Sequence, residues 1–130
     1  MRFRKILIVD DDEVILQFLE KKLAAQGYHT ICAKQGMEAV EKARSDSPDL
    51  ILMDIILPDI DGSEAVKLIH QDPLTKHIPV VFVSGILTKG EEGEASLDIK
   101  VAGKQYHAFA KPFTFESLLN EIEKIFGEVD

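Results

Sequence analysis

Residues able to bind metal ions or transfer chemical groups follow several apolar runs of this sequence. The runs at residues 6–9, 50–53, 80–83 and 108–110 are followed, in that order, by Asp10-Asp11-Asp12-Glu13, Asp54, Ser84 and Lys111-Pro112. If these runs are parallel strands, their carboxyl ends meet at one edge of a sheet, where open α/β sheets bind ligands. Carboxylates packed together repel one another unless a cation joins them, and oxygen ligands favour Mg²⁺. The sequence therefore predicts a magnesium site at this edge.

Each of these residues has a plainer explanation when it is taken alone. Acids such as those at residues 10–13 are common at solvated helix N-termini, where they interact favourably with the helix dipole. An acid such as Asp54 often forms a turn after a strand, and hydroxyls such as that of Ser84 usually satisfy nearby backbone groups. The magnesium hypothesis depends on the coincidence of these residues at the ends of separate runs.

The apolar runs also predict the elements that position these residues. Five runs, at residues 6–9, 30–33, 50–53, 80–83 and 108–110, are short and continuous, which is typical of parallel strands buried on both faces. Helical periods lie between them, with apolar residues at Ile15, Phe18, Leu19 and Leu23, then from Ala39 to Ala43 and from Ala65 to Ile69, and a last helix from Thr114 to Gly127. This alternation predicts an α/β fold, a (βα)5 doubly wound sandwich with a five-stranded parallel sheet.

Two local features refine this prediction. Asp61 and Glu64 have the spacing of a capping box, which predicts that a helix begins after Asp61. The stretch from Gly85 to about Gly103 is rich in glycine and glutamate and has only a weak helical period near residues 95–102. We expect a mobile loop and one short helix in that stretch.

Length and charge limit the kinds of protein this sequence can be. A chain of 130 residues can close one core, so we expect a single domain over residues 1–130. The net charge of −8 argues against a nucleic-acid surface, which needs clustered Lys and Arg. No apolar run approaches the roughly 18 residues of a membrane span, and the run after the basic start is too short for a signal peptide, so we expect a cytoplasmic protein. We expect no functional role for Cys32, the single cysteine.

Taken together, the motifs resemble the receiver domain of two-component response regulators over essentially the whole chain. They are Asp10-Asp11, Asp54, Pro58-Asp59-Ile60-Asp61-Gly62, Ser84-Gly85 and Lys111-Pro112-Phe113. The resemblance implies a flavodoxin-like fold with strand order 2-1-3-4-5. It also implies that Asp54 is the phosphoacceptor and that Asp10, Asp11, Asp54 and the backbone carbonyl of Ile56 bind Mg²⁺. Ser84 would donate to a phosphoryl oxygen, and Lys111 would pair with Asp54 and then with the transferred group.

The resemblance further implies the partners of the protein. A sensor histidine kinase, a histidine phosphotransfer protein or a small acyl phosphate would supply the phosphoryl group. The signal would pass to an unknown downstream protein, by altered contacts or by a phosphorylation-dependent dimer. Such a protein assists its own phosphorylation and dephosphorylation and is not a turnover enzyme on external substrates.

This sequence departs from the usual receiver pattern at several positions. The family usually has an aromatic residue three positions before the lysine, where this chain has Ala108, and the stretch between Ser84 and Lys111 is longer than usual. Ile56 and Ile86 occupy the positions that usually tune the lifetime of the phosphate. Because neither can hydrogen-bond an attacking water, we expect a long-lived aspartyl phosphate.

Two alternative functions stay open at this point. One is a phosphatase of the haloacid-dehalogenase type, whose first strand also ends in Asp-x-Asp, as Asp10-Asp11-Asp12 does; that family needs a further acidic motif well after its lysine, and only one amphipathic helix follows Lys111 here. The other is a receiver-like interaction module that no longer takes phosphate. The complete set of acid, hydroxyl and lysine argues against this module, while Ala108 favours it.

Overall fold

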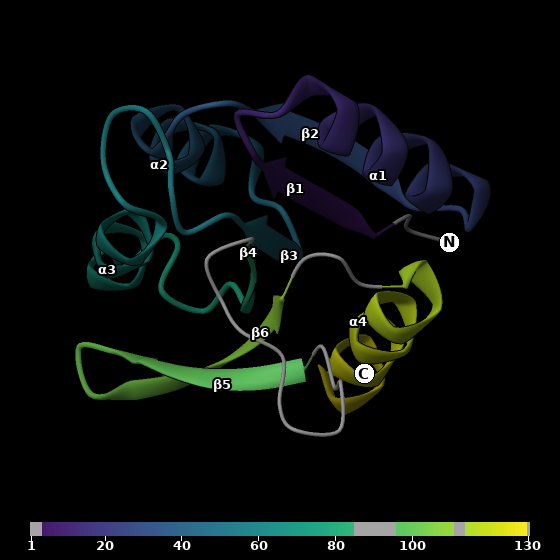
Figure 1. Ribbon diagram of the computed structural model, residues 1–130. Coiled ribbons are helices and arrows are strands. Elements are labelled where there is room, and N and C mark those ends of the chain that lie inside the picture. Colours follow the sequence, from purple (N-terminus) through teal and green to yellow (C-terminus); the bar gives the residue numbers. More distant parts are fainter. Residues whose placement is uncertain (1–3, 85–95, 111–113, 130) are drawn as a thin grey trace.

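The protein is a sheet covered by helices on both faces (Figure 1). The structure is a computed structural model, and it describes residues 4–84, 96–110 and 114–129. In chain order the elements are β1 (Lys5–Val9), α1 (Glu13–Ala25), β2 (His29–Ala33), α2 (Gly36–Asp46), β3 (Leu50–Met53), α3 (Gly62–Gln71), β4 (Val80–Ser84), β5 (Ser96–Val101), β6 (Lys104–Ala110) and α4 (Phe115–Val129). The predicted α/β fold class is confirmed.

The sheet has the order β2-β1-β3-β4-β6-β5. The first five of these strands are parallel to one another and correspond to the five predicted apolar runs, with β6 as the fifth. Their order is therefore the expected 2-1-3-4-5. The parallel register aligns the carboxyl ends, since Val9 lies opposite both Ala33 and Met53, and Ser84 lies opposite Ala110.

Two layers of apolar side chains hold the helices to the sheet. On one face, α1 and α4 pack against the strands through a cluster that includes Leu19, Leu23, Leu118 and Ile122. On the other face, α2 and α3 pack through a cluster that includes Ala43, Val66 and Ile69. Residues of β1 and β3 alternate between the two clusters, which explains why these strands are continuous apolar runs.

The prediction of five strands, all of them parallel, was wrong by one strand. The short helix expected between Gly85 and about Gly103 is not found at residues 96–102, and residues 85–95, where the expected mobile loop begins, lie outside the described residues. Residues 96–101 form β5, which pairs antiparallel with β6 at the edge of the sheet (Figure 1). The two strands join through Ala102 and Gly103, whose φ angles of 51° and 84° are typical of a two-residue hairpin turn. The sequence of β5, SLDIKV, alternates polar and apolar residues, and this period of two outweighs the weak helical period.

The helices follow the predictions with three exceptions, the first of which is that α4 continues past Gly127, its expected end, to Val129. Thr114 accepts a hydrogen bond at its Oγ1 from the Ser117 N–H (3.2 Å), so it caps α4 as expected. Asp61 is the N-cap residue of α3, but its side chain makes no capping hydrogen bond, so the expected capping box is not formed. Phe18, predicted to lie in the apolar stripe of α1, is 44% exposed, because the buried face of this helix runs through Leu16, Leu19 and Leu23.

In the part of the chain that the structure describes, no helix is both long enough and apolar enough to cross a membrane.

Candidate functional site

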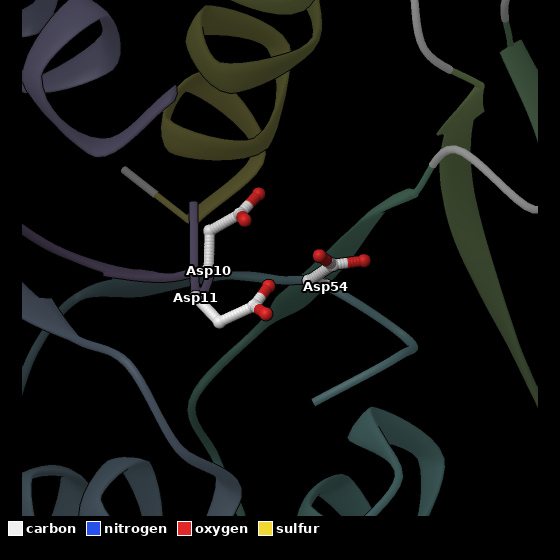
Figure 2. Close-up of side chains that lie close together, drawn as sticks. All are labelled: Asp10, Asp11 and Asp54. Atoms are coloured by element: carbon white, nitrogen blue, oxygen red, sulfur yellow. The ribbon is translucent and has the colours of Figure 1, made fainter. Parts of the chain in front are cut away.

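Three carboxylates meet at the carboxyl edge of the sheet (Figure 2). Asp10 and Asp11 follow β1, Asp54 follows β3, and one carboxylate oxygen from each lies within 4.8 Å of the others. Asp10 and Asp54 are only 3% and 7% exposed, whereas Asp11 faces solvent. Carboxylates this close together repel one another unless a cation joins them. This set of hard oxygen donors therefore suits a divalent cation such as Mg²⁺.

Backbone hydrogen bonds hold the two buried aspartates in place. The Asp10 N–H donates to the Ala33 carbonyl (3.1 Å), and the Asp54 N–H donates to the Val9 carbonyl (2.9 Å). These bonds extend the strand ladders by one residue beyond β1 and β3. The position of each carboxylate is therefore set by the sheet register and not by a free loop.

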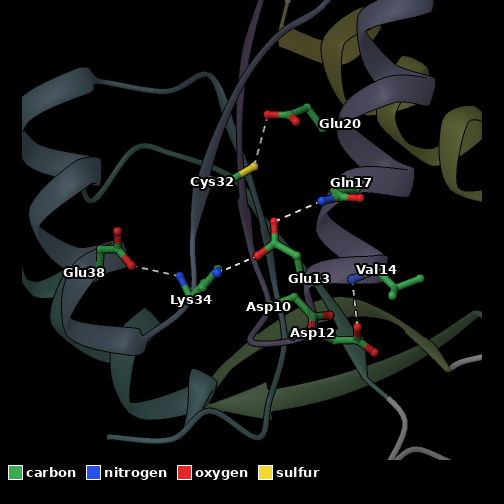
Figure 3. Close-up of polar contacts among 9 residues, drawn as sticks. All are labelled: Asp10, Asp12, Glu13, Val14, Gln17, Glu20, Cys32, Lys34 and Glu38. Atoms are coloured by element: carbon green, nitrogen blue, oxygen red, sulfur yellow. Dashed lines mark hydrogen bonds and ion pairs between the residues drawn. The ribbon is translucent and has the colours of Figure 1, made fainter.

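The other acids that follow β1 have different tasks. The Asp12 carboxylate accepts a hydrogen bond from the Val14 N–H (2.9 Å) and caps α1. Glu13 pairs with Lys34 at 2.5 Å (Figure 3). The pKa of Glu13 is lowered, chiefly by its hydrogen bond to Lys34. Of the four consecutive acids, only Asp10 and Asp11 join the carboxylate cluster among the described residues.

The loop after Asp54 is held against the backbone of that residue. Gly62, the first residue of α3, donates its N–H to the Ile55 carbonyl (2.6 Å). A Cβ atom added at Gly62 would lie 1.9 Å from the Asp54 carbonyl oxygen, a distance that no side chain can accept. Glycine is therefore required here so that α3 can approach the strand end that carries Asp54.

The same loop caps a different helix, a role that the sequence did not reveal. The Asp59 carboxylate accepts hydrogen bonds from the Gly36 N–H (2.7 Å) and the Met37 N–H (2.8 Å), the first two residues of α2. The pKa of Asp59 is lowered, with the hydrogen bond from Met37 as the largest cause. The residue that precedes α2, Gln35, makes no side-chain cap. No local pattern predicts this contact, because its partners are 22 and 23 residues away in the chain.

The remaining predicted site residues are described only in part. Ser84 ends β4, two strands from β1 in the sheet, and lies opposite Ala110 in the register. Lys111, predicted to pair with Asp54, lies outside the described residues, as does Ile86. Ile56, whose carbonyl is a predicted metal ligand, lies in the loop after Asp54 with a side chain that is 54% exposed.

Cys32, on β2, faces α1 and has no reactive environment. Its thiol donates to Glu20 (3.5 Å) at a cavity of about 210 Å³ that Glu13, Gln17 and Lys34 also line (Figure 3). Burial, followed by the charge of Glu20, raises the pKa of this thiol to about 11. At neutral pH the thiol is protonated and is therefore a weak nucleophile.

The position of the usual aromatic residue is filled by a small, fully buried side chain. Ala108 packs against Phe82 and is 0% exposed. Two residues earlier on the same face, Tyr106 stacks on His70 and meets Phe82 edge to face. The His70 Nε2–H donates to the Ile78 carbonyl (2.9 Å), which leaves Nδ1 to accept a hydrogen bond from the Tyr106 hydroxyl. This pair ties α3 to β6.

The sequence matches one family model over most of its length. Residues 6–123 match the model of the response regulator receiver domain. The polar-differentiation response regulator DivK of Brucella ovis is 34% identical over 125 residues, which cover 96% of this chain and 98% of that protein.

Solved structures of receiver domains have the same fold. A response regulator receiver domain protein (CheY-like) from Methanospirillum hungatei is 29% identical, with a TM-score of 0.80 over 98% of this chain and 96% of that one. The receiver domain of the sensor histidine kinase PA1611 from Pseudomonas aeruginosa is 25% identical, with a TM-score of 0.81 over 97% of this chain and 99% of that one. The PA1611 structure has a magnesium ion coordinated in its active site cleft.

Proposed function

This chain belongs to the response regulator receiver domain family, and we propose that it accepts a phosphoryl group on Asp54 in a reaction that depends on Mg²⁺. The observation that carries this proposal is the meeting of the Asp10, Asp11 and Asp54 carboxylates within 4.8 Å. Asp54 is the member of this cluster that directly follows β3, the central strand of the parallel part of the sheet.

Asp10, Asp11 and Asp54 are the side chains that would hold the metal ion, together with the backbone carbonyl of Ile56. The donor set supports this assignment, because three carboxylates within 4.8 Å of one another match the preference of Mg²⁺ for oxygen ligands. The magnesium ion reported in the cleft of the PA1611 receiver domain supports it as well. A bound Mg²⁺ ion neutralises charge that develops on the oxygens of the transferred group.

The reaction we assign to Asp54 is a direct phosphoryl transfer. A carboxylate oxygen of Asp54 attacks phosphorus while the bond from phosphorus to the donor breaks, and the bonding electrons leave with the donor. The donor is then released as imidazole from a phosphohistidine or as carboxylate from an acyl phosphate. Such transfers need mainly positioning and neutralisation of charge. We assign these tasks to the Ser84 hydroxyl and the Lys111 ammonium group, which would contact the oxygens of the phosphoryl group.

The partners follow from the same chemistry. A sensor histidine kinase or a histidine phosphotransfer protein would supply the phosphoryl group, and a downstream protein would read the phosphorylated state. Residues 1–130 would act as one receiver domain. The similarity to a DivK response regulator supports a place in two-component signalling.

The arrangement of the first loop favours a receiver over a phosphatase of the haloacid-dehalogenase type. That class uses the first and third residues of its Asp-x-Asp motif, here Asp10 and Asp12. In this protein the Asp12 carboxylate caps α1, and its neighbour Asp11 joins the cluster instead. A phosphomonoester turnover assay separates the two functions, since activity lost in Asp10→Asn but kept in Asp54→Asn would favour the phosphatase.

Intact-mass measurement after incubation with Mg²⁺ and acetyl phosphate tests the proposal directly. We expect wild type to gain one phosphoryl group, the gain to vanish in Asp54→Ala, and the gain to persist in the control Asp72→Ala, which removes an acid at the distant end of α3. EDTA should abolish the gain. A wild-type protein that gains no mass, or an Asp54→Ala variant that still gains it, would contradict the proposal.

A further inference from the structure

The N-terminal end of α2 contacts both loops that carry the carboxylate cluster. On one side, Asp59 in the loop after β3 accepts hydrogen bonds from Gly36 and Met37. On the other side, Lys34, two residues before α2, pairs with Glu13 at the start of α1 (Figure 3). The loop with Asp54 and the loop with Asp10 and Asp11 are thus joined through one helix end.

The two connections differ in strength. Lys34 and Glu13 are 58% and 53% exposed, and exposed ion pairs contribute little to stability. Asp59 is also exposed, but it holds two backbone N–H groups with one carboxylate, at 2.7 and 2.8 Å. Hydrogen bonds to a charged acceptor are stronger than neutral ones, and these two bonds satisfy donors that α2 cannot satisfy itself. Asp59 therefore carries most of the connection.

Packing next to Asp59 also holds the loop after β3 against α2. A Cβ atom added at Gly36 would lie 2.5 Å from Ile60 Cγ1, so the Ile60 side chain lies directly against the first residue of α2. At the end of the same loop, Gly62 bonds to the Ile55 carbonyl and lies against the Asp54 carbonyl. The segment from Asp54 to Gly62 is therefore fixed near both of its ends and at Asp59.

We propose that Asp59 is a positioning residue for the metal and phosphoryl site. By capping α2 it fixes the loop that follows Asp54, and with it the carbonyl of Ile56, relative to Asp10 and Asp11. This inference rests on the proposed function, because it concerns the affinity of the same site for Mg²⁺. Asp59 itself is a member of neither the carboxylate cluster nor the proposed ligand set.

The test compares Mg²⁺ affinity in Asp59→Ala with that in wild type, by isothermal titration calorimetry. We expect the dissociation constant for Mg²⁺ to rise about tenfold, the lower end of the effect of groups that orient metal ligands. The initial rate of phosphorylation by acetyl phosphate should need correspondingly more Mg²⁺ for half-saturation and should approach the wild-type rate at saturating Mg²⁺. A loss of helix stability alone does not change this half-saturation point.

The matched control is Asp72→Ala. Asp72 is an acid that also accepts a backbone hydrogen bond, from the Leu74 N–H (2.9 Å), and it lies at the far end of α3. Its removal changes the net charge as Asp59→Ala does, so unchanged Mg²⁺ affinity in Asp72→Ala excludes a general charge effect. A similar loss of affinity in both variants would overturn the proposal.

Asp59→Asn keeps a side-chain oxygen that can accept one of the two hydrogen bonds, so its affinity for Mg²⁺ should lie between those of wild type and Asp59→Ala. If Asp59→Ala does not fold, the comparison of Asp59→Asn with Asp72→Asn decides the question. Wild-type affinity in a folded Asp59 variant with a lowered unfolding temperature would show that the cap is only structural, and would overturn the inference while leaving the proposed function intact. A wild-type protein that neither binds Mg²⁺ nor gains a phosphoryl group would instead overturn the proposed function.

Discussion

Gly62 lies against the backbone of Asp54, so close that a Cβ atom at position 62 would be 1.9 Å from the Asp54 carbonyl oxygen. This contact joins the first turn of α3 to the end of β3, where the proposed phosphoacceptor lies. The placement of the Asp54 carboxylate thus depends on a glycine eight positions later in the sequence.

Gly62→Ala should destabilise the protein, although alanine is the better helix former. Overpacking of this kind costs about 1–3 kcal/mol in the free energy of unfolding, and urea denaturation measures it. The control is Gly127→Ala in α4, where an added Cβ meets nothing within 4 Å. That change should stabilise the protein by up to about 1 kcal/mol. Equal effects of the two substitutions would contradict the close approach seen here.

Asp11→Asn should stabilise the protein in the absence of metal and weaken its response to Mg²⁺. It removes one of three carboxylates that lie within 4.8 Å of one another, and the lost repulsion should raise the free energy of unfolding by a few tenths to about 1 kcal/mol. Wild type should gain about 2.7 kcal/mol at a Mg²⁺ concentration 100 times its dissociation constant, and the variant much less at the same concentration.

Urea unfolding with EDTA and with MgCl₂ measures both effects of Asp11→Asn. Glu41→Gln on the exposed surface of α2 is the control. It should change neither the free energy of unfolding in EDTA nor the gain in that free energy on addition of MgCl₂. If Mg²⁺ stabilises the Asp11 variant as much as wild type, Asp11 is not a ligand.

Stability should fall below about pH 6.5 because of His70. Burial lowers the pKa of His70 below its usual value of 6.5; the hydrogen bond to Ile78 opposes this effect, and the charge of Lys104 adds to it. Between the two pKa values the unfolded chain binds more protons than the folded protein, so the stability from neutral His70 is fully present above pH 6.5 and is lost as the pH falls through the folded-state pKa.

Urea midpoints measured from about pH 7.5 to about pH 5.5 test this dependence. The fall in stability should be smaller in His70→Asn, which keeps a polar group but does not titrate. His29→Asn, which changes an exposed histidine of β2, should leave the change of the urea midpoint with pH as it is in wild type. The prediction would be contradicted if the urea midpoint of His70→Asn changed with pH as much as that of wild type.

Ile56→Asn should shorten the lifetime of the aspartyl phosphate. The Ile56 side chain lies in the loop after Asp54, where an alkyl group cannot orient a water for attack on phosphorus. An amide at this position can hydrogen-bond such a water and should speed phosphate release by roughly tenfold. The measurement is a time course of phosphate loss after labelling with acetyl phosphate, with Ile56→Val as the control that keeps an alkyl group. Rapid loss in wild type that Ile56→Asn does not change would count against a long-lived phosphate.

The sequence alone determined the five parallel strands and the edge at which the acids gather. Runs such as residues 6–9 and 50–53 encode burial on both faces, and burial is a local property that a few consecutive residues specify. The resemblance to receiver domains added the strand order and the importance of Asp10, Asp11 and Asp54. The sequence did not reveal β5 at residues 96–101, because a weak helical period of 3.6 residues competed there with a period of two residues, which pairing to β6 stabilises.

Tertiary structure alone decided how the site is held. The two backbone groups that Asp59 caps lie 22 and 23 residues away, and the atoms that Gly62 must approach belong to a different element. Nor could the spacing of the four consecutive acids reveal that Asp12 caps α1 while Asp11 joins Asp10 and Asp54. A sequence pattern specifies which side chains are buried, but contacts between distant segments form only when packing sets the distances between elements.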